Sequence, residues 1–264
     1  MDKFKGLSSA TLKNIAIITM LIDHMAHVFY RPFILPILGK DFGYPLYLAM
    51  RIIGRIAFII FAYQVGQAIV YTKSRKRYLI ALASFAIISE IPFNLALRGK
   101  LIEVTHQNVF ITLFLGALCL TLMDRFKSKK WLSVLIAFAG IALAEALRTD
   151  YGGAGVLLII LLYIFRDNMY FGGMYVFGIF VAAMMFSNAT WGVINHPDEV
   201  FMTALINGAL ETTLELFGII GIMLLVFYNG QKGKGLNKWV YYIFYPGHLL
   251  ILYGVVRLIS IVQR

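Results

Sequence analysis

The chain has 264 residues, of which 60% are apolar and only 14% are charged, and its formal net charge is +11. This composition and the positive mean hydropathy exclude a soluble domain and predict an integral membrane protein. The single cysteine, Cys119, excludes an internal disulfide. Membrane topology and attraction to anionic lipid account for most of the positive charge, so nucleic-acid binding is not expected.

Apolar stretches long enough to cross a membrane, roughly 17 to 25 residues each, follow one another along almost the whole chain. They are residues 12–30, 46–71, 78–97, 107–124, 131–148, 151–165, 170–187, 202–228 and 239–261. The fifth and sixth are short and are separated only by the turn at 149–153, so a re-entrant hairpin is an alternative there. We expect an all-α polytopic bundle of about nine transmembrane helices, forming a single domain over residues 1–264.

Lysine and arginine gather in alternate connections of this arrangement, and positive connections stay in the cytoplasm. The basic residues of these connections are Lys3, Lys5, Lys73, Arg75, Lys76, Arg77, Arg125, Lys127, Lys129, Lys130, Lys232, Lys234 and Lys238. The intervening connections are nearly balanced or acidic. The pattern predicts a multi-pass protein of the bacterial cytoplasmic (inner) membrane, with its N-terminus cytoplasmic and its C-terminus extracytoplasmic.

The first apolar stretch contains Asp23 and His24, where a membrane helix should carry no charge. It is too long for a signal peptide and is expected to be a retained helix. Lys13 precedes His24 by eleven residues, so the two share one helix face about 16 Å apart. Ionisable groups at such depth usually face a polar cavity or a partner. An adjacent acid and imidazole favour proton chemistry, whereas Lys13 also fits a side chain that snorkels to the inner interface.

Ionisable and polar residues from several predicted helices lie at one level in the outer half of the membrane. They are His24, His27, Arg51, Arg55, Glu90, His106, Gln107, Asn108, Arg148, Asp150 and Tyr151. Pro92 interrupts an apolar helix beside this level, as is common where a helix lines a cavity. Alternatively, the two arginines of the second helix pair with Glu90 or Asp23 and only hold helices together.

Two pairs of residues that contain glutamate remain to be interpreted. Glu145 and Arg148 are three residues apart on one helix and are expected to form a structural pair. Glu211 and Glu215 share a face of the eighth predicted helix, where they are either structural or line the mouth of a cavity.

Six sequence blocks occur in order over nearly the whole chain. They are 12–16 running into 19–24, then 51–58, 89–94, 107–110, 148–152 and 245–249. In this order the blocks resemble those of the TraX family of conjugal-transfer membrane proteins. That family includes an enzyme implicated in N-terminal acetylation of F-type pilin, and it resembles the wider superfamily of multi-spanning membrane acyltransferases.

The resemblance implies a donor and a position for it. Members of the superfamily carry a basic residue, ten intervening positions and a histidine on the first helix, and they usually take acetyl-CoA as donor. Here Lys13 and His24 match this pattern, with lysine where many members have arginine, so bidentate phosphate recognition is lost. The nucleotide of coenzyme A is expected to stay at the cytoplasmic face, near Lys13 and the connection that contains Arg75 and Arg77. Its pantetheine arm reaches on the order of 15 Å, about the rise to His24.

Roles follow for the remaining residues. His24 is the expected general base, or forms a transient acetyl-imidazole. Asp23 would orient or charge-balance an imidazole, either His24 or His27, and Glu90 would fix the arginines. The expected donors to the oxyanion are Arg51, Arg55, Gln107 and Asn108. His106, Asp150 and Tyr151 are expected on the acceptor side. Tyr245 and His248 are expected to contact the donor, with a packing role as the alternative for His248.

The expected function is therefore transfer of an acetyl group from cytoplasmic acetyl-CoA to an amine or hydroxyl of a pilin-like peptide, a sugar or a polymer. No metal is expected, because His24, His27 and His106 lack the spacing of a known zinc motif. The alternatives are a transporter whose buried charges form a proton or anion path, and a non-catalytic assembly factor that binds a small membrane protein.

Overall fold

A computed structural model describes residues 6–198 and 200–262 of the chain. Lys3 and Lys5, which contribute to the orientation prediction, lie outside these residues. The covered residues form helices and connecting turns, with two isolated bridges and no strand. The predicted all-α fold is confirmed.

Helices occupy each of the nine predicted stretches. They are α1 (Ser9–Phe29), α2 (Leu35–Tyr71), α3 (Arg75–Arg98), α4 (Val109–Arg125), α5 (Lys130–Ala146), α6 (Gly152–Ile164), α7 (Met169–Asn195), α8 (Phe201–Thr212), α9 (Ile219–Val226) and α10 (Lys238–Val262). Three short helical turns join some of them: η1 (Tyr30–Ile34), η2 (Arg166–Asn168) and η3 (Thr213–Gly218). The eighth stretch is thus divided into α8, η3 and α9.

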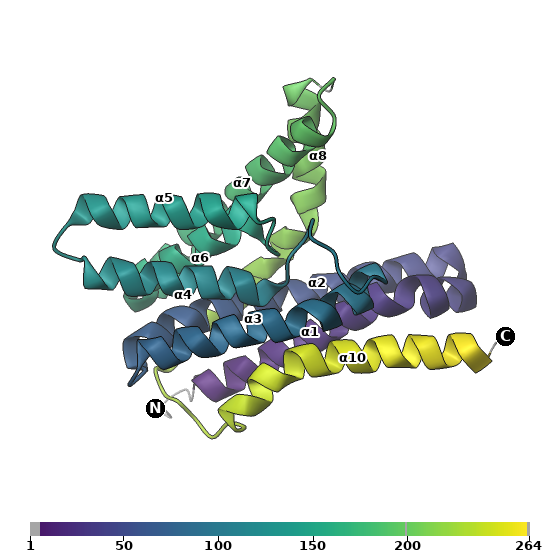
Figure 1. The fold of residues 1–264 in the computed structure, drawn as a ribbon, viewed down its shortest axis with the longest axis horizontal. Helices are drawn as coiled ribbons and strands as arrows, with labels where there is room; N and C mark the ends of the chain where they lie inside the picture. Colours follow the sequence, from purple (N-terminus) through teal and green to yellow (C-terminus); the bar gives the residue numbers. More distant parts are fainter. Residues whose placement is uncertain (1–5, 199, 263–264) are drawn as a thin grey trace, which may run out of the picture.

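Five segments of the described chain are long and apolar enough to cross a membrane: Ser9–Tyr71, Arg75–Arg98, Arg166–Asn195, Phe201–Val226 and Lys238–Val262. The first of them folds back on itself as the α1–α2 pair (Figure 1). The other predicted spans are short, with 17 residues in α4 and in α5 and 13 in α6. The membrane character is confirmed, while the count of nine spans and the orientation stay predictions.

Helix boundaries follow from capping residues. Ser8, Ser74 and Asn108 cap the N-termini of α1, α3 and α4, where each side chain accepts a backbone N–H of the first turn. Gly99 ends α3 in the left-handed conformation with φ 67°, which glycine adopts without strain. Gly39 bends α2 near its start with φ 68°. These residues fix where each helix begins, ends or turns.

The centre of the bundle is α6, which packs against α2, α4, α5 and α7. Its side chains Val156, Leu158, Ile159 and Leu162 are fully buried. A helix enclosed by protein is expected to be apolar on every face, which explains the unbroken apolar sequence of this segment. At one side of the bundle, α10 packs against α1 and α3.

The helix ends are sorted between two ends of the molecule (Figure 1). The α2–α3, α4–α5 and α9–α10 connections, which carry the basic clusters, lie at the end where α1 begins. The α1–α2 turn and the end of α10 lie at the opposite end. The connections α3–α4 and α5–α6 stop short of that end, and they come to lie beside the middle of α1 and α2. This arrangement brings loop residues to the level of His24.

Candidate active site

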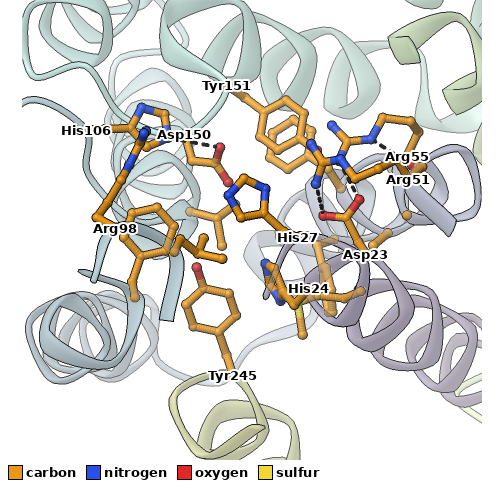
Figure 2. Close-up of a pocket in the computed structure, with 18 residues that line it drawn as sticks. Asp23, His24, His27, Arg51, Arg55, Arg98, His106, Asp150, Tyr151 and Tyr245 are labelled. Atoms are coloured by element: carbon orange, nitrogen blue, oxygen red, sulfur yellow. Dashed lines mark hydrogen bonds and ion pairs between the residues drawn. The ribbon is translucent and has the colours of Figure 1, made fainter. Parts of the chain in front are cut away.

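A cavity of about 300 Å³, here called the central cavity, lies among α1, α2, α3, α10 and the α3–α4 and α5–α6 connections (Figure 2). Its polar lining residues are Asp23, His24, His27, Arg51, Arg55, Arg98, His106, Asp150, Tyr151 and Tyr245. Most of the residues predicted for the site therefore meet around one space. Arg98 was missed, because a basic residue at a helix end has an ordinary interfacial explanation.

His24 is held by a second histidine from the last helix. Its Nδ1 lies 2.7 Å from Nε2 of His248, and Nδ1 of His248 lies 2.6 Å from the carbonyl oxygen of Phe244. A carbonyl only accepts, so Nδ1 of His248 carries the proton and its Nε2 accepts when the ring is neutral. His24 then donates from Nδ1. The chain of hydrogen bonds leaves Nε2 of His24 as the unprotonated nitrogen, whose lone pair can accept a proton.

The Asp23 carboxylate bonds to two arginines and to no imidazole, so the predicted orienting role is wrong, while the alternative of charge balance is not contradicted. Its Oδ2 accepts a hydrogen bond of 2.6 Å from Arg51, and its Oδ1 accepts one of 2.7 Å from Arg55. Neighbouring residues on an α-helix project about 100° apart, so Asp23 faces α2 while His24 faces α10. Gly54 permits this approach, because a Cβ at that position would overlap the Asp23 carboxylate.

The counter-ions of the arginines are Asp23, which pairs with both, and Glu215, which pairs with Arg55; Glu90 pairs with neither. Nη1 of Arg55 donates to Oε1 of Glu215 at 2.5 Å, which joins η3 to α2. Arg51, Asp23, Arg55 and Glu215 thus form a row of alternating charges across three elements, and the last three are each 8% exposed. Alternating pairing is what permits charges to be buried, so the structural interpretation of the two arginines holds for these contacts. Within residues 6–198 and 200–262, the buried Nε of Arg51 has no hydrogen-bond acceptor.

Glu90, Asn108 and Gln107 hold the start of α4 instead of lining the cavity. Asn108 is fully buried, donates from Nδ2 to Ala86 at 2.8 Å and to Glu90, and caps α4. The side chain of Gln107 donates to the carbonyl of Val104 at 2.8 Å. Their amide groups are occupied, so the predicted role of Gln107 and Asn108 as oxyanion donors is not supported.

A second space of about 320 Å³, the lateral cavity, borders the central cavity at Arg55, His106, Asp150 and Tyr151. Nε2 of His106 lies 3.5 Å from Oδ1 of Asp150 in the α5–α6 connection. Burial raises the pKa of Asp150, but the hydrogen bond and charge of His106 and the charge of Arg55 outweigh it, and the net pKa is lowered. Asp150 is therefore ionised at neutral pH. The predicted acceptor-side residues His106, Asp150 and Tyr151 lie where the two cavities meet.

A third space of about 530 Å³, the basic-end cavity, borders the central cavity at Met20, Phe61, Val109 and Tyr245. Its lining also includes Lys13, Lys232 and Lys238. Nζ of Lys13 lies 5.8 Å from the ring centre of Tyr241 on α10. A continuous lining therefore runs from these lysines to His24.

Lys232 and Lys238 were read from the sequence only as topology signals, because their approach to α1 depends on how the α9–α10 connection returns. Arg75 and Arg77, predicted to contact the donor, are not among the residues that line the basic-end cavity. Arg75 instead forms a 2.5 Å ion pair with Asp124 at the end of α4. This pairing ties the start of α3 to the end of α4.

An all-helical fold with five membrane-capable segments and a buried polar cavity defines a polytopic helical membrane protein with an internal site. Residues 8–256 match the family model described as TraX protein, so the chain belongs to the TraX family and the resemblance is confirmed. No curated protein and no solved structure matches the chain. Among the residues that the structure describes, no three His, Cys, Asp or Glu side chains form a group able to hold a metal ion.

Proposed function

We propose that this protein is a membrane-embedded acyltransferase that moves an acetyl group from acetyl-CoA to an amine or hydroxyl acceptor. The observation that carries the proposal is His24. Its Nδ1 is engaged by His248, its Nε2 keeps a free lone pair, and it lines a cavity that borders the other two. A histidine so oriented is suited to general base catalysis.

The donor enters through the basic-end cavity. The phosphates of coenzyme A cannot enter lipid, and Lys13, Lys232 and Lys238 offer positive charge at one end of this cavity. The rise along α1 from Lys13 to His24 is about 16 Å, a distance that an extended pantetheine arm can bridge. The border with the central cavity includes Met20, Phe61 and Val109, so the uncharged arm passes apolar side chains before the thioester reaches His24.

In the chemical step, the acceptor nitrogen or oxygen attacks the thioester carbonyl carbon while Nε2 of His24 takes its proton. The tetrahedral intermediate collapses, the carbon–sulfur bond breaks, and His24 returns the proton to the departing thiolate. The hydroxyl of Tyr245, which points into the cavity in Figure 2, and the free Nε of Arg51 are the candidate donors to the oxyanion. Direct attack by Nε2, which forms an acetyl-imidazole, is the alternative covalent route.

The membrane arrangement completes the proposal. We place the basic connections and the N-terminus in the cytoplasm and the C-terminus outside, with nine spans in the bacterial inner membrane. The grouping of the basic connections at one end supports this orientation. Acetyl-CoA is then taken from the cytoplasm, and the acceptor, a pilin-like peptide, a sugar or a polymer, arrives from the membrane or its outer side.

The test is binding and hydrolysis of acetyl-CoA by the purified protein in detergent. We expect wild type and His24→Ala to bind acetyl-CoA equally, with slow thioester loss only in wild type. The control is His196→Ala, which removes an exposed histidine outside the central cavity and should hydrolyse like wild type. Absence of acetyl-CoA binding by folded wild type contradicts the proposal.

A transporter is the second candidate, because the row of charges from Arg51 to Glu215 lies at the border of two cavities. It predicts pH-coupled ion flux in liposomes without acyl-CoA turnover. A non-catalytic assembly factor predicts that His24→Ala is silent in every assay while variants of the lipid-facing helices are not.

A further inference from the structure

The lateral cavity contains a cation that the proposed chemistry does not use, Arg148. Its guanidinium carbon lies 3.9 Å from the ring centre of Trp191, and both residues line this cavity. In the part of the chain that the structure describes, the guanidinium forms no hydrogen bond and no ion pair. The contact with the ring face consumes none of its five N–H groups, so these donors stay available.

The carboxylates near Arg148 are already engaged. Glu145, which was predicted to pair with Arg148, accepts instead from Ser187 at 2.5 Å, from the Trp191 indole at 2.6 Å and from the backbone of Gly153 at 2.8 Å. The other two acidic groups of this cavity, Glu215 and Asp150, face Arg55 and His106 respectively. Arg148 is thus a half-buried cation whose N–H donors meet no acceptor among the described residues.

The backbone holds Arg148 firmly in this position. It adopts φ 50°, a left-handed conformation that is unfavourable for a residue other than glycine. Its N–H donates to the Glu145 carbonyl at 3.0 Å, and its carbonyl accepts from the Gln107 N–H at 3.0 Å. The α5–α6 connection and the start of α4 therefore fix the Cα of Arg148, while Trp191 fixes its guanidinium. A pre-positioned planar cation of this kind suits a carboxylate or a phosphate.

We propose that the lateral cavity is the acceptor chamber and that Arg148 binds an anionic group, a carboxylate or a phosphate, carried by the acceptor. The identification of the ligand as the acceptor rests on the proposed function, whereas the anion site itself does not. The chamber meets the central cavity at Arg55, His106, Asp150 and Tyr151. An acceptor anchored at Arg148 extends its nucleophile past these residues towards His24, and the donor arrives from the basic-end cavity on another side.

The anion site is tested by thiol chemistry that needs no acceptor. Asn195 also lines the lateral cavity, one helical turn after Trp191 on the same face of α7. Asn195→Cys is placed in a Cys119→Ala background, because Cys119 is the chain's sole cysteine. Its rates with the anionic sulfonatoethyl and the cationic trimethylammonioethyl methanethiosulfonate reagents are each divided by the rate with a free thiol. We then take the ratio of the corrected rate for the anionic reagent to that for the cationic reagent, and we expect this ratio to exceed one.

Two substitutions of Arg148 decide what produces this preference. Arg148→Asn removes the charge but tolerates the left-handed backbone, so the fold should persist, and the ratio should fall about tenfold. Arg148→Lys keeps the charge and should retain most of the preference. If adding Arg148→Asn to the Asn195→Cys, Cys119→Ala protein leaves the ratio unchanged, the proposal is overturned. An Asn195→Cys thiol that reacts with neither reagent while the protein is folded overturns it as well.

The second arm tests the acceptor role with matched probes. Acetylation is compared for glucosamine and phosphorylated glucosamine, and for a dipeptide and its C-terminal amide. We expect the anionic member of one pair to have the lower KM, and only in proteins that retain Arg148. The pair that shows this difference identifies the group that Arg148 binds as a phosphate or a carboxylate. Absence of thioester hydrolysis by wild type would refute the acyltransferase proposal and would not affect the anion site. Equal KM values within both pairs would refute the acceptor role alone.

Discussion

The two sides of α1 carry buried polar residues with opposite properties. On the α2 side, Asp23 accepts from Arg51 and Arg55, and Arg55 continues to Glu215. On the α10 side, His24 bonds to His248, and the chain of bonds ends at a backbone carbonyl. The first group satisfies its charges within the protein, whereas the second leaves an imidazole nitrogen without a proton.

This difference separates stability from chemistry on one helix. A row of paired, alternating charges fixes how α1, α2 and η3 pack, because each charge would be costly alone. A relay that ends on a carbonyl fixes a tautomer and leaves reactivity at the other end. Substitutions on the α2 side of α1 are therefore expected to lower stability, and those on the α10 side are expected to lower the rate of the chemical step.

The largest effect is expected from breaking the row of charges. Arg55→Ala leaves Asp23 with one arginine and Glu215 with none, at positions that are each 8% exposed. Removing one partner of a buried pair costs about 3–5 kcal/mol, so we expect a strongly lowered thermal unfolding temperature in detergent. The control is Arg55→Ala combined with Glu215→Gln, which removes the stranded charge and should recover part of the loss. Equal unfolding temperatures of wild type and Arg55→Ala contradict a structural row.

The next effect tests the α10 side. His248→Leu removes the acceptor for Nδ1 of His24, so the unprotonated nitrogen is no longer fixed at Nε2. We expect kcat for thioester loss to fall about a hundredfold, with KM for acetyl-CoA and the unfolding temperature little changed. His248→Gln keeps a side-chain acceptor and should restore much of kcat. A His248→Leu protein that loses stability as well as kcat, without rescue by glutamine, would place His248 with the packing residues.

How far the site follows from the sequence differs between these two sides. Hydropathy and helical spacing predict the depth of Asp23 and His24 in the membrane. They also place the two arginines of α2 and His106 of the α3–α4 connection at the same level. The His24–His248 bond does not, because its partners are 224 positions apart and meet only through the packing of α10 on α1. Likewise, Glu215 and not Glu90 reaches Arg55, because η3 packs directly against α2.

One error could have been avoided from local chemistry. Asn108 stands directly before an apolar run, which is a typical N-cap signal, and it does cap α4. Its predicted role as an oxyanion donor ignored that signal. Arg75 and Lys232 were indistinguishable in the sequence, because both lie in basic connections and only tertiary packing decides which of them faces a cavity.

A smaller effect is expected at the far end of the basic-end cavity. Lys232→Ala removes one of three lysines that line it, and Lys232 is not among the residues that line the central cavity. A partly exposed charge contributes about 1 kcal/mol, so we expect KM for acetyl-CoA to rise about fivefold while kcat stays constant. The measurement is the thioester assay over a range of donor concentrations. A changed kcat with constant KM would mean that the lysine acts on the chemical step and that the donor binds elsewhere.

The smallest effect sharpens this result, because Arg75 carries the same charge in another basic connection. It forms an ion pair with Asp124 and is absent from the lining of the basic-end cavity. Arg75→Ala should change KM for acetyl-CoA less than twofold and should lower stability by at most about 1 kcal/mol, the value of a half-exposed pair. If Arg75→Ala raised KM as much as Lys232→Ala, donor affinity would depend on the summed charge of the cytoplasmic end and not on contacts within the cavity. The contrast between the two variants thus separates long-range attraction of coenzyme A from its direct binding.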